Sequence, residues 1–174
     1  MTGIAIFGAG RIGGAVANLL NARNLADTIV LYDRSPELLQ AQVLDIMHTG
    51  RQISISTDLH DIHECDVLIC TAGLPRNPTI KTRADLLHTN MPAARECAKV
   101  LDGFSGVVVV VTNPMDTITY YLHQLTGIAK ERIIGFGGQL DSARFSYILK
   151  KRGISGDAVI IGEHGEHQVP LFSR

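Results

Sequence analysis

The chain has 174 residues, of which 45% are hydrophobic and 19% are charged, and its formal net charge is −1. This composition is ordinary for a soluble globular protein with one domain, or with one domain and part of a second. A net charge so close to zero gives no reason to expect nucleic acid or an anionic membrane as a partner. Tryptophan is absent and the apolar residues are mostly aliphatic, which favours parallel strands covered by helices on both faces.

Short apolar runs alternate with longer segments of helical periodicity along the chain. The pattern predicts strands at Ile4–Phe7, Thr28–Tyr32, Val67–Thr71, Val107–Val111, Ile133–Phe136 and Ala158–Ile161. It predicts helices at Arg11–Ala22, Pro36–His48, Arg83–Leu101, Asp116–Gln124 and Leu140–Arg152. Strands that alternate with helices indicate βαβ units around a parallel sheet. The predicted fold class is therefore α/β, with a doubly wound parallel sheet.

The cysteines and the amino terminus bear on the cellular compartment. Cys65, Cys70 and Cys97 form no CxxC pair and are odd in number, so we expect reduced thiols. The amino terminus lacks a basic region followed by a long apolar stretch, and Val107–Val111 is too short to span a bilayer. We therefore expect a soluble cytoplasmic protein without membrane or nucleic-acid partners.

Three glycines stand between the first predicted strand and the first predicted helix. Gly8, Gly10 and Gly13 form the pattern GxGxxG, which permits a tight turn, close approach of a pyrophosphate and close helix–strand packing. The helix that begins at Arg11 and Ile12 then presents free N–H groups to the phosphates. A glycine-rich turn without a ligand is the alternative. The flanking strand and helix instead favour a dinucleotide site on a Rossmann-type sheet.

Asp33 stands at the end of the second predicted strand, about twenty positions beyond Gly13. A carboxylate there can accept hydrogen bonds from a ribose diol and would repel a 2′-phosphate, which favours NAD over NADP. Arg34 and Ser35 follow directly, and they could instead bind a phosphate if Asp33 turned away. The predicted cofactor is NAD, with this alternative left open.

Four further segments carry polar residues in a specific order along the chain. They are Thr71–Asn90, Val111–Asp116, Leu140–Phe145 and Gly162–His167. With the glycine motif, they make the chain resemble the lactate/malate dehydrogenase family over essentially its whole length. The resemblance implies an NAD-binding Rossmann domain at residues 1–140 and the truncated start of an α+β substrate domain at residues 141–174. It also implies that this chain is the N-terminal portion of a longer protein, which forms a homo-oligomer.

The resemblance implies catalytic roles for His164 and Asp141. Oxidation of a 2-hydroxy acid needs a base for the hydroxyl proton, and histidine is the side chain suited to that task near neutral pH. A carboxylate on the other ring nitrogen would fix the tautomer and stabilise the imidazolium, which is the role that Asp141 takes by resemblance. Taken singly, Asp141 could be a helix cap and His164 a loop histidine. The joint pattern favours the catalytic interpretation.

The resemblance also implies residues that bind substrate and cofactor. Arg144 would pair with the C1 carboxylate, because a guanidinium is a planar two-pronged donor, although alone it could be a solvated helix charge. Arg83 would polarise the reacting C–O bond, and Asn113 would hydrogen-bond the substrate. The expected cofactor contacts are Gly8, Gly10, Arg11, Ile12, Gly13, Asp33, Asn90, Val111, Thr112 and Asn113.

Arg76 bears on the choice between malate and lactate as substrate. It follows Gly73 in the loop that, in this family, closes over the substrate, and a cation there can pair with the second carboxylate of malate. Leaving one member of such a buried pair without its partner costs roughly 3–5 kcal/mol. Family members with arginine here act on malate, whereas glutamine commonly accompanies lactate; a merely solubilising charge is the alternative. Arg76 and Arg83 are 7 positions apart, one more than in the commonest lids of the malate enzymes, so we expect a bulge within residues 77–82.

Two clusters of polar residues raise the alternative of a metal site. One contains Glu163, His164, Glu166 and His167, and the other contains His60, His63 and Cys65. Neither has the ligand spacing of a known structural zinc site, so we predict no metal. The second cluster lies within Asp58–Asp66, a charged stretch that we expect to be a solvated loop.

The expected function is reversible hydride transfer between malate and NAD, giving oxaloacetate and NADH, as a malate dehydrogenase of the tricarboxylic acid cycle performs. The expected substrate is thus a small molecule. One alternative is a dehydrogenase for lactate or another 2-hydroxy acid. Another is a dinucleotide-binding fragment that is catalytically incomplete, which would bind NADH without turning over any 2-oxo acid.

Overall fold

The computed structural model describes residues 1–75, 77–156 and 158–171. Its main body is a six-stranded parallel sheet in the order β3-β2-β1-β4-β5-β6. The strands are β1 (Gly3–Phe7), β2 (Thr28–Tyr32), β3 (Ser54–Ser56), β4 (Val67–Cys70), β5 (Val107–Val110) and β6 (Ile133–Gly135). The strand order reverses between β1 and β4, as in a doubly wound nucleotide-binding sheet. The predicted fold class is confirmed.

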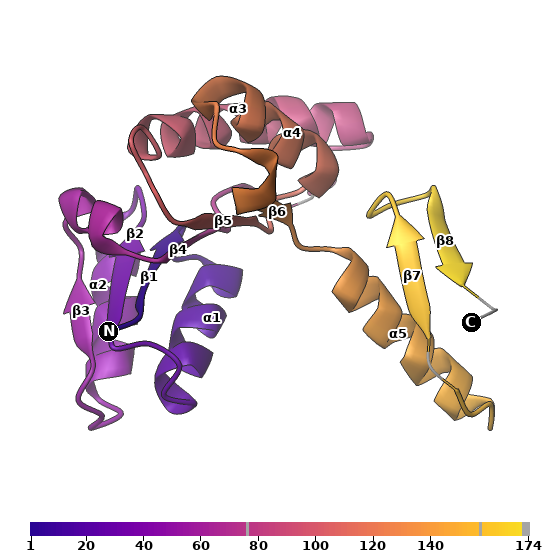
Figure 1. Ribbon diagram of the computed structural model, residues 1–174, viewed down its shortest axis with the longest axis horizontal. Helices are drawn as coiled ribbons and strands as arrows, with labels where there is room; N and C mark the ends of the chain where they lie inside the picture. Colours follow the sequence, from indigo (N-terminus) through magenta and orange to yellow (C-terminus); the bar gives the residue numbers. More distant parts are fainter. Residues whose placement is uncertain (76, 157, 172–174) are drawn as a thin grey trace.

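Helices cover both faces of this sheet (Figure 1). Helices α1 (Arg11–Ala22) and α2 (Pro36–Met47) lie on one face, and α3 (Arg83–Val100) and α4 (Met115–Thr126) lie on the other. None of the helices in the described part of the chain is long and apolar enough to cross a membrane.

Two apolar clusters form the core, one on each side of the sheet. Alternate residues of β1 point to opposite faces, so Phe7 belongs to the cluster beneath α3 and α4, whereas Ile6 belongs to the cluster beneath α1 and α2. Both side chains are at most 1% exposed. Burial on both faces explains why the central strands are almost continuously apolar.

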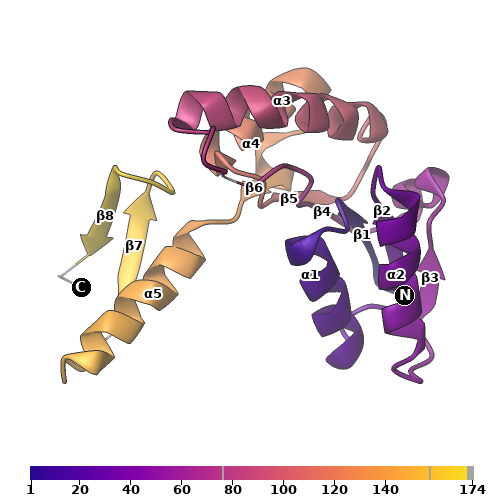
Figure 2. The same cartoon turned by 180° about the vertical axis from the view of Figure 1, so that it is seen from behind.

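A separate arm follows the sheet and projects away from it (Figures 1 and 2). It consists of α5 (Gly138–Lys151) and an antiparallel hairpin of β7 (Val159–Gly162) and β8 (Gln168–Leu171). The Ser142 hydroxyl accepts the Ile160 N–H at 2.9 Å and donates to the Gly138 carbonyl at 2.7 Å, which ties helix to hairpin. The expected domain boundary after residue 140 falls within the first turn of α5, and it stays a prediction.

The structure corrects the expectation of a solvated loop at Asp58–Asp66. Residues Leu59–Glu64 form a 3₁₀ helix, η1, and Ile62 within it is fully buried. Side chains three positions apart share one face of a 3₁₀ helix, so Leu59 and Ile62 both reach the core while the charged residues face outward. Strands β3 and β8, and the short 3₁₀ helix η2 (Lys130–Arg132), were also not predicted.

The turn from β1 into α1 packs tightly at two glycines. Gly8 has a φ of +104°, and a Cβ there would lie 2.5 Å from the Ala72 backbone. A Cβ on Gly13 would lie 1.9 Å from the Gly8 carbonyl oxygen. Loop and helix can therefore approach this closely only without side chains. Gly10 differs, because a Cβ there would meet no atom within 4 Å.

We expect Gly13→Ala to lower the free energy of unfolding by about 1–3 kcal/mol, because the added methyl group overlaps backbone that must shift. Gly10→Ala is the matched control. Gly10 has a φ of −67°, which alanine adopts readily, so its change should stay within roughly 0.5 kcal/mol. Urea denaturation of both variants without ligand measures the difference. Equal losses would show that the contact between Gly13 and Gly8 does not limit helix packing.

Candidate active site

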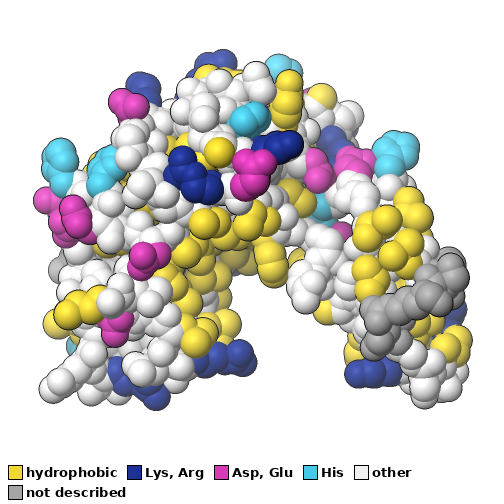
Figure 3. All heavy atoms as spheres, viewed as in Figure 1, with side chains coloured by type: hydrophobic (Ala, Val, Ile, Leu, Met, Phe, Trp, Pro, Cys, Tyr) yellow, Lys and Arg dark blue, Asp and Glu magenta, His cyan; other side chains and the backbone are white. Residues whose placement is uncertain are grey.

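The carboxyl ends of the central strands open into a cavity of about 1220 Å³. The body of the sheet bounds it on one side, and residues of α5 and the hairpin bound it on the other; Figure 3 shows the molecule hollowed between these two parts. The cavity brings together most of the predicted site residues, although they are far apart in sequence. Those that line it are Gly10, Arg11, Ile12, Arg83, Asn90, Val111, Thr112, Asn113, Asp141, Arg144 and His164.

The remaining predicted residues lie elsewhere. Gly8 and Asp33 line an adjoining cavity of about 330 Å³, which shares Asn90 with the larger one. Gly13 packs against the loop after β1 and lines neither of these two cavities. Arg76 lies outside the described residues, so its predicted role stays a prediction.

The amino end of α1 fits a pyrophosphate. Its N-cap is Gly10, and no side chain caps the helix. The N–H groups of the first helical turn have no partner within a helix, and they add to the positive end of the helix dipole. Since the space beside the Gly10 Cα is open towards the cavity, a phosphate can approach this backbone closely.

Asp33 is held in place by two backbone N–H groups. Its Oδ2 accepts from Ala9 at 2.8 Å, and its Oδ1 accepts from Ser35 at 3.0 Å. Each carboxylate oxygen keeps a further lone pair for a ligand. Asp33 therefore stays at the edge of the smaller cavity, and the Ser35 hydroxyl is used as the N-cap of α2, where it accepts the Leu38 N–H at 3.2 Å. These contacts place a carboxylate, not a phosphate-binding hydroxyl, at this end of the nucleotide site.

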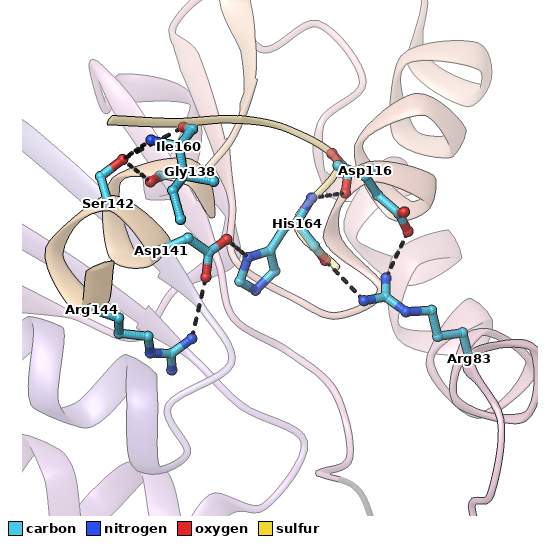
Figure 4. A network of polar contacts seen from close by, with 9 residues as sticks. Arg83, Asp116, Gly138, Asp141, Ser142, Arg144, Ile160 and His164 are labelled. Carbon is cyan, nitrogen blue, oxygen red and sulfur yellow. Dashed lines mark hydrogen bonds and ion pairs between the residues drawn. The ribbon is translucent and has the colours of Figure 1, made fainter. Parts of the chain in front are cut away.

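The best-defined polar contact at the large cavity joins His164 to Asp141 (Figure 4). The His164 Nδ1 lies 2.6 Å from the Asp141 Oδ2. Asp141, in the first turn of α5, is only 8% exposed. A carboxylate acceptor favours the proton on Nδ1 of a neutral imidazole, which leaves Nε2 as the ring nitrogen able to take a proton.

Arg144 lies one turn after Asp141 on the same helix, as the spacing predicts. Its Nη1 donates to the Asp141 Oδ1 at 3.4 Å, and 63% of its side chain is exposed. Most of its N–H groups therefore remain available to an anion in the cavity. Figure 4 shows Arg144 and His164 on either side of Asp141.

Arg83 reaches the loop that carries His164 from the first turn of α3. Its Nη1 donates to the Glu163 Oε1 at 2.9 Å, and its Nη2 donates to the His164 carbonyl at 3.1 Å. A capping box of Thr82 and Asp85 sets the start of this helix, and hydrogen bonds from Thr82 lower the pKa of Asp85. Arg83 thus lines the cavity and also connects the sheet body to the arm.

Asp116 is a positioning residue that the sequence analysis did not single out. It lies in the first turn of α4, and its Oδ2 accepts the His164 N–H at 2.9 Å. Together with Arg83, it holds the backbone of His164 while Asp141 holds the ring (Figure 4). Asp116 stands three positions after Asn113, at the end of the segment Val111–Asp116. An acidic residue in the first turn of a helix is explained by the helix dipole alone, so no local pattern signalled this contact.

Asn90 contributes to the shape of the cavity wall. It is 2% exposed, its Oδ1 accepts the Leu74 N–H at 2.7 Å, and its Nδ2 donates to the Asn113 carbonyl at 2.7 Å. The amide thus holds the loops after β4 and β5 together, and its predicted contact with the cofactor stays a prediction. The side chain of Asn113 is exposed and forms no hydrogen bond with the described residues. Nowhere among residues 1–75, 77–156 and 158–171 do three His, Cys, Asp or Glu side chains gather closely enough to hold a metal ion.

We expect Asp116→Ala to speed hydrogen exchange at the His164 N–H by about five- to tenfold, because loss of one hydrogen bond is worth about 1 kcal/mol. Asp116→Asn keeps a carbonyl acceptor at the same place and should retain most of the protection. The Ile160 N–H, which is bonded to Ser142, serves as an internal control measured by NMR in the same samples. Equal acceleration at both N–H groups would indicate a general loosening of the arm instead.

Comparisons with known proteins agree with this site. A family profile described as lactate/malate dehydrogenase, NAD binding domain, matches residues 2–135. The malate dehydrogenase of Pyrobaculum aerophilum is 36% identical over 183 residues, covering 98% of this chain and 59% of that protein. The malate dehydrogenase of Aeropyrum pernix is 35% identical over 180 residues, covering 97% and 58%. The chain therefore spans a little under three fifths of the length of these curated relatives.

Solved structures show the same likeness. The malate dehydrogenase from Aeropyrum pernix superposes with a TM-score of 0.87 at 37% identity, covering 97% of this chain and 58% of that one. The lactate dehydrogenase from Cryptosporidium parvum, complexed with lactic acid and nicotinamide adenine dinucleotide, also gives 0.87, at 32% identity, covering 97% and 56%. With the glycine turn, the acidic residue after β2 and the His164–Asp141 pair in place, the chain belongs to the lactate/malate dehydrogenase family, and it carries that family's NAD-binding domain.

Proposed function

We propose that this chain forms the nucleotide-binding and proton-transfer part of an NAD-dependent malate dehydrogenase. The observation that carries the proposal is the His164–Asp141 pair on the wall of the cavity into which the amino end of α1 opens. One cavity thus combines a phosphate-binding helix end with an oriented imidazole. That is the combination required for moving a hydride to a nicotinamide and a proton to a base.

The chain supplies both ends of the nucleotide site. The N–H groups at the start of α1 bind the pyrophosphate, and Asp33 accepts hydrogen bonds from the ribose diol. Bound NAD supplies the hydride acceptor for C2 of malate. Asn113, with its exposed amide at the end of β5, faces the same cavity and is available to the substrate.

His164 takes the proton of the malate hydroxyl on Nε2. Asp141 fixes the tautomer through Nδ1 and stabilises the imidazolium that forms. Because Asp141 is buried, its carboxylate is poorly screened by solvent and its interaction with the cationic ring is strengthened. In the reverse direction, the same imidazolium returns its proton to the carbonyl oxygen of oxaloacetate.

Two arginines hold the substrate's negative charge. Arg144 pairs with the C1 carboxylate in a two-pronged contact. Arg83 polarises the reacting C–O bond, while its present bonds to Glu163 and to the His164 carbonyl keep its guanidinium beside the base. Both arginines line the cavity, which supports their roles as the two cations that contact a 2-hydroxy acid.

The preference for malate over lactate rests on sequence rather than on fold. The similar malate and lactate dehydrogenase structures superpose equally well, so the backbone does not distinguish the substrates. The malate dehydrogenases of Pyrobaculum aerophilum and Aeropyrum pernix, both similar over nearly all of this chain, support malate. Arg76 supports it as well, since its guanidinium would pair with the second carboxylate in a closed site.

The cellular setting is also a proposal. Three free, buried cysteines suit the reducing cytoplasm. A malate enzyme there would serve the tricarboxylic acid cycle. The near-zero net charge supports a small-molecule substrate, without nucleic acid or membrane as a partner. The family resemblance supports a homo-oligomeric assembly.

The direct test is NADH oxidation by the chain with oxaloacetate and then pyruvate, with His164→Asn as the variant. We expect turnover with oxaloacetate, and a loss of about 10²- to 10⁴-fold in the variant, because the imidazolium that donates the proton to the carbonyl oxygen is removed. The NADH dissociation constant, measured by fluorescence, should change little. NADH binding without turnover of either acid would contradict the catalytic proposal and would show that the chain only binds the dinucleotide.

Arg76→Gln tests the substrate preference. We expect kcat/KM for oxaloacetate to fall by about a hundredfold or more, because the second carboxylate loses its partner. The value for pyruvate, which has a methyl group there, should change much less. The ratio of the two values is the measurement, and equal losses on both acids would contradict the role of Arg76.

A further inference from the structure

A cluster of Tyr32, Arg34 and Glu96 lies on the wall of the smaller cavity, beside Asp33. The Arg34 Nε donates to the Glu96 Oε2 at 2.5 Å, and its Nη2 forms an ion pair with the same oxygen. The Tyr32 hydroxyl donates to the other oxygen, Oε1. Strand β2 and helix α3 are thereby joined beside Asp33, through Tyr32 and Glu96, which are 64 positions apart.

Arg34 is the residue that could reverse the preference for NAD. It directly follows Asp33, and 61% of its side chain is exposed. A free guanidinium at this position is the group best suited to bind a 2′-phosphate through paired hydrogen bonds. In this structure, two of its nitrogens are instead bonded to Glu96.

The position of the Glu96 side chain is fixed by burial and by a second hydrogen bond, which favours its ion pair with Arg34. An exposed ion pair contributes little when both side chains must lose their freedom. Only 28% of the Glu96 side chain is exposed, and its second oxygen is bonded to Tyr32, whose ring stacks on Phe7 with centroids 4.8 Å apart. Although burial alone would raise it, the hydrogen bonds from Tyr32 and Arg34 lower the pKa of Glu96, so its carboxylate is charged at neutral pH.

We propose that Glu96 is a specificity-determining residue, which keeps Arg34 away from the 2′ position of the adenosine ribose and so favours NAD over NADP. This inference rests on the proposed function. With Glu96 present, Asp33 and Glu96 together outweigh the single charge of Arg34, and a 2′-phosphate is repelled. Without the Glu96 charge, the guanidinium is free to turn towards the phosphate, and the local charge no longer opposes it.

The test is direct binding of NADH and NADPH to Glu96→Gln, measured by nucleotide fluorescence at low ionic strength. Glutamine keeps the shape of the side chain and removes its charge. We expect NADPH to bind about tenfold more tightly, because a charge-assisted contact with Arg34 becomes possible. The NADH dissociation constant should stay within about threefold, since no contact of Asp33 is altered.

Two further variants complete the design. Glu131→Gln makes the same charge change at an exposed glutamate that pairs with Lys130 just before the amino end of β6, and it should alter neither constant. Arg34→Ala combined with Glu96→Gln should abolish the gain in NADPH affinity, because the guanidinium is required for it.

The outcomes separate the two proposals. If Glu96→Gln binds NADH normally and the ratio of the two dissociation constants is unchanged, the role of Glu96 is overturned while the nucleotide site stands. A gain in NADPH affinity that persists without Arg34 also overturns it. If the unmodified chain binds neither nucleotide, the proposed function itself fails, and this inference fails with it.

Discussion

The parallel pairing of the central strands is the constraint on which the site depends. Phe7 is in register with Cys70, and Cys70 with Val110, so β1, β4 and β5 end at one edge of the sheet. Backbone bonds continue across this edge, from the Thr71 N–H to the Phe7 carbonyl and from the Val111 N–H to the Cys70 carbonyl, both at 2.9 Å. The loops after three strands therefore meet at the point where the strand order reverses, which is where α/β sheets bind their ligands.

The His164–Asp141 pair adds a second constraint, because it belongs to the arm and must be placed against the sheet. Asp141 comes from α5 and His164 from the β7–β8 hairpin. Arg83 and Asp116, at the starts of α3 and α4, both bind the backbone of His164 and not its ring. This division leaves the imidazole free to exchange a proton while the loop is fixed. The first turns of two helices that cover the sheet therefore also position His164.

Much of this architecture could be predicted from local patterns, because apolar runs and glycine spacing report directly on strands, helices and the turn at Gly8. Elements whose sequence is mostly polar could not be predicted in this way. Ile62 is a single buried residue within a charged stretch, and β3 at the sheet edge is only Ser54–Ser56. His164 and Asp141 were singled out through their motifs, and the structure places their side chains in contact. The contact between Asp116 and His164 was not predicted, because these residues are 48 positions apart and no local sequence pattern indicates that they are partners.

Asp33 and Glu96, two carboxylates that line the smaller cavity, differ in the other groups that they bind. Asp33 accepts the N–H groups of Ala9 and Ser35, so it shapes the turn after β1 and the start of α2 before any ligand arrives. Its replacement would therefore disturb the pyrophosphate turn together with the ribose contact, and the two effects could not be separated. Glu96 has no bond to that turn; its partners are the side chains of Tyr32 and Arg34. The charge beside the smaller cavity can thus change through Glu96 while the backbone of the glycine turn stays as it is.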